Sequence, residues 1–163
     1  MFKLNVIVLI SCFGLTACGY KPLYGVDSSG RNISSKLNAI SVDPQSNRQD
    51  QLIRNEILSS IGSNSNSPIY SLSFKSNAND ADTVQAFNAD TLRKSYQLNV
   101  KFDLVRKANG KSVLKGTTFA HVSYDKTAAP FSDYQAKISA QERAAKQVGS
   151  DIRTRLAAYF ASR

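Results

Sequence analysis

A run of alternating apolar and polar residues in the centre of the chain most constrains its fold. From Tyr96 to Leu104 every even-numbered position is apolar, whereas the odd-numbered positions between them are polar or charged. Because successive side chains of a β-strand point to opposite faces of the sheet, this pattern predicts a strand with one apolar and one polar face. The sheet that contains it must bury the apolar face under other elements.

Two shorter strands are expected before this one. Residues 37–42 alternate weakly and end at an Asp-Pro dipeptide, which is typical of a turn. Residues 70–74 alternate cleanly between apolar and polar side chains. The polar residues 77–80 are expected to interrupt this second strand, and residues 83–87 to continue it beyond a bulge or bend.

A fourth strand is expected after a hairpin. Asn109-Gly110 is typical of a tight turn between antiparallel strands. The return strand is predicted over residues 113–124, with a buried set that consists of Thr118, Ala120, Val122 and Tyr124.

Two amphipathic helices are also expected. In the first, Ile53, Ile57 and Ile61 recur every four residues, after a capping box at residues 46–49 and before a capping Gly62. The second begins with a capping box at residues 132–135 and reaches Phe160. Its apolar stripe is Ile138, Ala145, Val148, Ile152, Leu156 and Tyr159.

The predicted element order is β-α-β-β-β-α, which favours an α/β (α+β) two-layer sandwich. We expect a four-stranded mixed sheet with both helices on one face and a polar opposite face. The length suits a single domain over residues 37–163, with no internal repeat.

The N-terminus is typical of an export signal. Lys3 precedes an apolar run that is shorter than the roughly 18 residues of a membrane-spanning helix, and Leu15-Thr16-Ala17-Cys18 ends it. These four residues resemble the bacterial lipobox. We therefore predict a signal peptide over residues 1–17, with Cys18 as the lipidated first residue of the mature chain; the alternative is an ordinary secretory signal.

Residues 18–36 mix Gly, Pro and Ser without a period, so we expect a tether between the acyl anchor and the domain. Gly19 follows the cysteine where lipoproteins kept in the inner membrane often carry Asp, which favours the outer membrane. The expected localisation is an anchored, periplasm-facing protein.

The charge balance restricts the partners. The net charge is +9, and +8 once Lys3 leaves with the signal peptide. Such an excess of cations favours anionic partners, here phospholipid headgroups, phosphorylated glycolipids or acidic proteins, although the basic residues can equally be a solvated surface. An exported protein is not expected to bind nucleic acid.

The residues offer little for catalysis. His121 is the only histidine, and Cys18 is the only cysteine expected in the mature chain, so a nucleophilic triad and a metal cluster are not expected. The chain has no Gly-rich phosphate loop. A catalytic pair of carboxylates is an alternative that the sequence leaves open, and Glu56 and Glu142 are the only glutamates. We predict a binding module, not an enzyme, with no cofactor.

Basic residues gather at two places near the predicted sheet. Arg93 and Lys94 enter the central strand, while Lys111 and Lys115 follow the hairpin. Arg and Lys are the usual partners of phosphate groups, so these four are the candidate ligand-binding residues. Solvated hairpin tips and protected edge strands are the alternative explanation.

Three stretches together resemble a known family. They are Cys-Gly-Tyr-Lys-Pro-Leu-Tyr-Gly at residues 18–25, Thr-Leu-Arg at residues 91–93 and Asp-Ile-Arg-Thr-Arg-Leu at residues 151–156. The chain resembles the LPS-assembly lipoprotein LptE, in particular its alphaproteobacterial branch.

The resemblance implies an outer-membrane lipoprotein that plugs the lumen of the LptD β-barrel and assists lipopolysaccharide assembly. Lipopolysaccharide would then be the ligand of the four basic residues. Two alternatives are a lipoprotein adaptor of another envelope transport or secretion complex, and a lipid-anchored periplasmic hydrolase with an acidic pair in a pocket.

Overall fold

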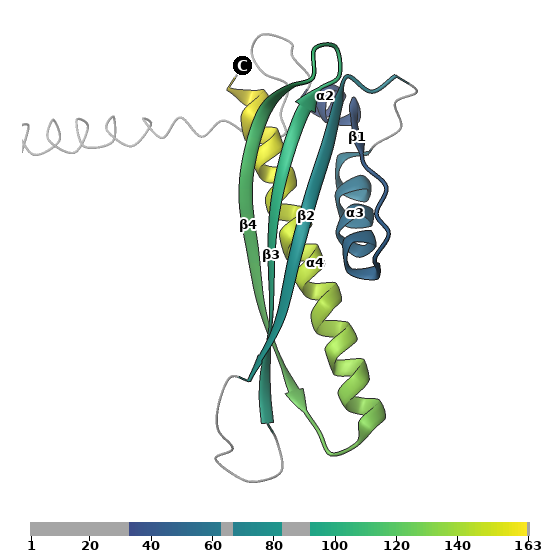
Figure 1. The fold of residues 1–163 in the computed structure, drawn as a ribbon, viewed down its shortest axis with the longest axis vertical. Coiled ribbons are helices and arrows are strands. Elements are labelled where there is room, and N and C mark those ends of the chain that lie inside the picture. Colours follow the sequence, from purple (N-terminus) through teal and green to yellow (C-terminus); the bar gives the residue numbers. More distant parts are fainter. Residues whose placement is uncertain (1–32, 63–66, 83–91, 163) are drawn as a thin grey trace, which may run out of the picture.

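The computed structural model describes residues 33–62, 67–82 and 92–162 (Figure 1). The elements in chain order are α2 (Ile33–Asn38), β1 (Ile40–Val42), α3 (Arg48–Ile61), β2 (Tyr70–Asp82), β3 (Leu92–Arg106), β4 (Lys111–Lys126) and α4 (Pro130–Ala161). The domain is elongated, because the three long strands and α4 run along the same axis.

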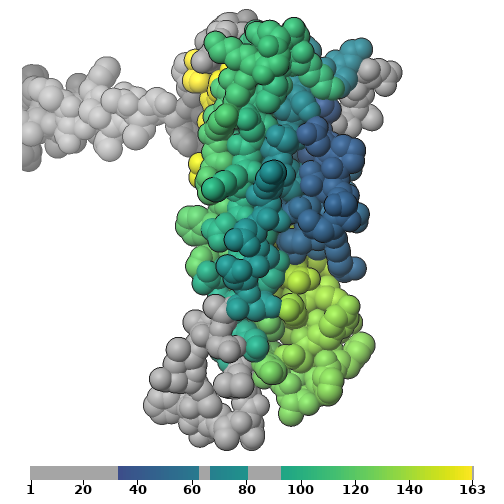
Figure 2. Space-filling view, viewed as in Figure 1, coloured from purple at the N-terminus to yellow at the C-terminus, as the bar shows by residue number. Residues whose placement is uncertain are grey.

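The strands form one mixed sheet in the order β1-β2-β3-β4, in which β1 is parallel to β2 and the other neighbours are antiparallel. The helices form the second layer, so the predicted two-layer α+β fold is confirmed. Figure 2 shows α3 in dark blue beside the upper strands only, with the N-terminal half of α4 in light green extending below it.

The core lies between the even-numbered residues of β3 and the two long helices. The side chains from Tyr96 to Leu104 at those positions are each at most 4% exposed. They share one cluster with Ile53 and Ile57 of α3 and with Ile152 of α4. The predicted stripes are confirmed, except that Ile138 and Tyr159 are only half-buried.

The helix α2 was not expected. Residues 33–36 had been assigned to the tether and Leu37 to the first strand, but Ile33 and Leu37 lie on one helical face and are 5% and 3% exposed. An i, i+4 apolar pair is typical of a helix that packs through one face. The folded domain therefore includes residues 33–36, and the first strand shrinks to Ile40–Val42.

The second strand is longer than predicted. No interruption occurs at residues 77–80, because β2 stays paired with β3 down to Asp82 opposite Lys94. These polar side chains are exposed on a part of the strand that neither β1 nor α3 covers. The expected continuation over residues 83–87 lies outside the described residues.

The ends of the long helices differ from the predicted caps. Asn47, not Ser46, caps α3, since its Oδ1 accepts the Asp50 N–H at 2.7 Å. The helix α4 starts at Pro130, two residues before the predicted Ser132, because a proline at the first helical position loses no hydrogen bond. Gly62 ends α3 with a φ of 64°, as predicted.

We expect Ile152→Ala to lower the free energy of unfolding by about 2–5 kcal/mol, because Ile152 is 0% exposed and the truncation leaves a cavity. Urea denaturation measures the change. Gln147→Ala, at an exposed position of the same helix, is the control and should stay within about 0.5 kcal/mol. An equal effect of both substitutions would contradict the assigned core.

Candidate ligand-binding surface

The outer face of the sheet, opposite the helices, carries a hollow of about 530 Å³. Each of the three long strands contributes three consecutive residues to its lining: Ser73–Lys75, Lys101–Asp103 and Lys115–Thr117. The odd-numbered residues of these strands point to this face, because their even-numbered neighbours are held in the core.

Three lysines and one carboxylate set the charge of the hollow. Lys75 and Lys101 are directly opposite each other on β2 and β3. Like charges at such positions repel, so they cost stability unless an anion lies between them. Lys115 Nζ lies 3.4 Å from Asp103 Oδ2, and Ser112 donates to the other oxygen of this carboxylate. The hollow therefore keeps a positive charge.

Only one of the four predicted basic residues lines this hollow. Lys115 does, whereas Lys111 is exposed at the hairpin opposite Arg106. The guanidinium of Arg106 lies 5.8 Å from the centroid of the Tyr70 ring, on the side of the sheet that carries the helices. Lys111 and Lys115 therefore do not form one cluster.

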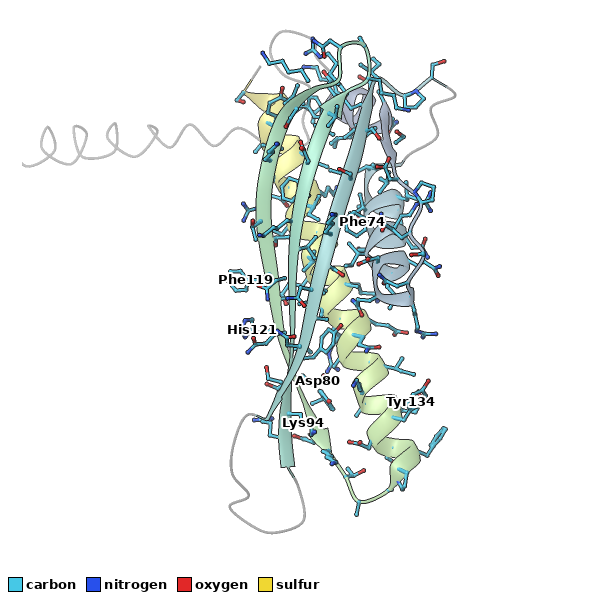
Figure 3. The ribbon with its side chains drawn as sticks, in the orientation of Figure 1. Phe74, Asp80, Lys94, Phe119, His121 and Tyr134 are labelled. Carbon is cyan, nitrogen blue, oxygen red and sulfur yellow. The ribbon has the colours of Figure 1, made fainter. Side chains whose placement is uncertain are left out.

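Arg93 and Lys94 also separate. Arg93 lies exposed and pairs with Asp125 across the β3–β4 ladder at 3.4 Å. Lys94 is the next residue, so it belongs to the opposite face, and Figure 3 shows it near Asp80 at the far end of the strands. Arg93 lies ten residues, roughly 34 Å along the strand, from the level of Lys115. Cys18 lies outside the described residues.

Sequence reasoning missed Lys75 and Lys101. Alternation placed Lys75 and Lys101 on the polar faces of their strands, but it could not show that the two strands pair in the register that sets these lysines opposite each other. A predicted register for β2 and β3 would have found them.

A second polar cluster lies on the helix side of the sheet, below α3. Asp80 of β2 forms an ion pair with Lys137 of α4, and this hydrogen bond raises the pKa of Lys137. Burial, then the charges of Asp80 and Asp50, raises the pKa of Tyr96 to about 12. The ion pair between Asp80 and Lys137 links the N-terminal half of α4 to β2.

The carboxylate pair that the sequence leaves open lies between the two long helices. Glu56 and Glu142 do line one hollow of about 320 Å³ between α3 and α4, together with Lys146. Glu142 is exposed, so it lacks the desolvation by which enzymes tune a general acid. Among the described residues no three His, Cys, Asp or Glu side chains gather as metal ligands.

His121 lies exposed on β4, with its ring 5.6 Å from that of Phe119 in an edge-to-face arrangement. Within residues 33–62, 67–82 and 92–162, no helix has the length and hydropathy to cross a membrane.

No protein-family model and no curated protein sequence matches the chain. Several solved structures do. A candidate lipoprotein from Caulobacter crescentus CB15 is 26% identical with a TM-score of 0.69, over 80% of this chain and 96% of that one.

Two further structures share the fold alone. They are a minor lipoprotein from Acinetobacter baumannii, at 15% identity and a TM-score of 0.53 over 73% of this chain and 88% of that one, and the rare lipoprotein B from Shewanella oneidensis, at 11% identity and a TM-score of 0.54 over 76% and 95%.

The raised pKa of Tyr96 predicts a loss of stability at high pH. An unfolded tyrosine loses its proton near pH 10, whereas the folded Tyr96 keeps it up to about pH 12, so stability falls as the pH rises through this window. We expect Tyr96→Phe to make this fall shallower in urea denaturation between pH 9 and 11.5. Tyr134→Phe, at a side chain 61% exposed, should leave the slope unchanged.

Proposed function

We propose that the chain is an outer-membrane lipoprotein that binds and plugs an LptD-type β-barrel and assists lipopolysaccharide assembly at the outer leaflet, without catalysis. The observation that carries this proposal is a fold shared with solved lipoproteins, together with an N-terminal segment that resembles a lipobox ending at Cys18.

The acyl anchor and the position of the domain are compatible with this role. Burial of acyl chains contributes about 0.8 kcal/mol per methylene, so several chains on Cys18 suffice for stable anchoring. The link to Ile33 is about 14 residues, which reach roughly 50 Å when extended. The strand β3 is 15 residues long, or roughly 50 Å. The tether therefore permits the domain to enter a barrel lumen.

The surface of the domain supports the same proposal. The lumen of a transmembrane β-barrel is polar, and the outer face of this sheet carries Ser, Asn, Gln and Lys at its odd-numbered positions. An elongated module with a polar face suits such a lumen better than it suits a lipid environment.

The hollow on the outer face is the site that we propose for the phosphates of lipopolysaccharide. Lys75, Lys101 and Lys115 surround it, and an anion between Lys75 and Lys101 would relieve their mutual repulsion. The more distant Arg93, Lys94 and Lys111 remain proposed contacts of a large ligand, but not of this hollow.

An adaptor of another envelope complex would share the anchor and the fold, and it would differ only in its partner. A hydrolase would need the carboxylates of Glu56 and Glu142 in a desolvated pair, and the exposure of Glu142 does not favour it.

Charge reversal tests the hollow. We expect Lys75→Glu with Lys101→Glu to weaken lipopolysaccharide binding by about tenfold or more, equivalent to about 1.4 kcal/mol, and rising salt to weaken binding of the unmodified chain. Arg93→Glu with Lys94→Glu is the comparison pair outside the hollow and should weaken binding less than the first pair does. Lys111→Glu with Lys115→Glu has one member in the hollow and should have an intermediate effect. If the first pair binds as the unmodified chain does while folded, the hollow is not the phosphate site.

Photo-crosslinking in cells tests the barrel. Crosslinkable residues at exposed positions of the outer face, such as Asn99 and Thr117, should yield adducts with an LptD-like barrel. The buried position Val148 is the control and should yield none. Adducts with a different envelope protein from most exposed positions would favour the adaptor.

A further inference from the structure

The strand β4 forms an edge of the sheet over its whole length. It is 16 residues long and pairs with β3 on one side. Among the described residues no strand pairs with its other side. An exposed edge carries a row of backbone N–H and C=O groups that can accept another strand.

The hydrogen bonds show which residues present these groups. The Lys107 N–H donates to Ile69 O at 2.9 Å, so the odd-numbered residues of β3 bond toward β2 and the even-numbered ones toward β4. In the observed register Val100 is opposite Thr118, which turns the backbone groups of Thr117, Phe119 and His121 outward.

An independent contact supports this assignment. Arg143 of α4 donates from Nη2 to Ser123 O at 3.2 Å, so this carbonyl, two residues beyond His121, also points away from β3. Arg143 thereby occupies the edge at Ser123. Thr117, Phe119 and His121 lie on the part of the edge that precedes this contact.

The composition of this part is unusual for an edge. Residues 116–122 contain no Lys, Arg, Asp or Glu, although charged residues are the common protection of edge strands. Phe119 is 64% exposed, and Figure 3 shows Phe119 and His121 projecting from β4 away from the rest of the molecule. The centre of the edge therefore lacks charged residues that would prevent pairing with another strand, and Lys115 lies just before this uncharged part.

A groove of about 430 Å³ lies between this edge and α4. Its lining is Thr118, Phe119, Gln147, Ser150, Asp151, Thr154 and Arg155. An added strand lies about 4.8 Å from its neighbour, so it would run along this groove. Its side chains would alternate between the polar surface of α4 and the aromatic pair on the outer face.

We propose that Thr117–His121 of β4 binds an extended segment of a partner protein by β-strand addition. The segment has uncharged, β-forming residues at its centre and acidic residues at both ends. One acidic end meets Lys115, and the other meets Arg143, roughly 27 Å along the strand. The proposal does not depend on the barrel or on lipopolysaccharide.

The charges argue against a second copy of the chain as the occupant. Antiparallel self-pairing centred on Phe119 sets Lys115 of one copy opposite Ser123 of the other, whose carbonyl is held by Arg143. Two cations would meet at each end of the interface. Acidic ends on a different segment turn both of these contacts into attraction.

The test uses the full chain in detergent micelles and a synthetic peptide, acetyl-Glu-Thr-Val-Thr-Val-Thr-Val-Thr-Glu-amide, whose two glutamates are eight residues apart, followed by amide NMR and hydrogen exchange. The peptide should slow exchange at the amides of Thr117, Phe119 and His121. The same peptide with Lys at both ends should bind at least about tenfold more weakly.

Two substitutions separate binding from folding. His121→Pro removes an outward N–H without breaking the ladder to β3. The variant should therefore keep the fold and bind the peptide about tenfold or more weakly. Val122→Pro is its matched control, since the N–H of Val122 faces β3 and its loss should destabilise the domain. Phe119→Lys places a charge on the edge and should lower the affinity for the peptide as His121→Pro does. It replaces His121→Pro as the test if that variant does not fold.

Several results would overturn the proposal. They are equal binding of the Lys-ended peptide, no protection of the edge amides at millimolar peptide, or peptide-induced shifts confined to the hollow around Lys75 and Lys101. A dimer in sedimentation that Phe119→Lys dissociates would assign the edge to a second copy instead.

Discussion

The burial of one face of β3 against α4 is the contact on which the rest of the domain depends. β3 lies between β2 and β4, and its residues Leu98 and Val100 are fully buried against helix residues such as Ile152. Shifting this strand by one residue would move its whole apolar set into water. The core therefore fixes the register, and the register in turn fixes which polar residues share the outer face.

This dependence explains why neighbouring basic residues have different surroundings. Arg93 and Lys94 are adjacent in sequence but belong to opposite faces, whereas Lys75 and Lys101 are 26 positions apart and directly opposite each other. Charged side chains gather on one face of a sheet when they occupy alternate positions of strands that pair with each other. Adjacent charges in the sequence therefore do not predict a charged cluster in the sheet.

The sequence predicted elements well where one periodicity was strong. The i, i+4 isoleucines of α3, its capping Gly62 and the alternation of β3 each determine a local structure through nearby residues alone. It failed where the outcome depends on distant partners. The polar end of β2 is a strand because β3 pairs with it, and α2 forms in a segment whose two apolar residues gain from packing on the core.

The candidate site was predictable to the same extent. The sequence indicated basic residues near the sheet and named Lys115, but the hollow depends on the register of three strands and the open edge depends on the strand order. Neither is determined by periodicity, because alternation gives the face of a side chain and says nothing of its cross-strand neighbour.

The two proposed surfaces meet at one residue, and this has a consequence for how they work together. Lys115 lines the hollow on the outer face and also lies at one end of the open edge of β4. An anion in the hollow and an acidic segment on the edge would compete for an ion pair with Lys115, whose Nζ already lies 3.4 Å from Asp103 Oδ2. Since coupling between two binding sites is reciprocal, each occupant should weaken the other by the same factor. A ligand bound in the hollow would thus lower the affinity of β4 for the partner segment, and dissociation of that ligand would restore the affinity.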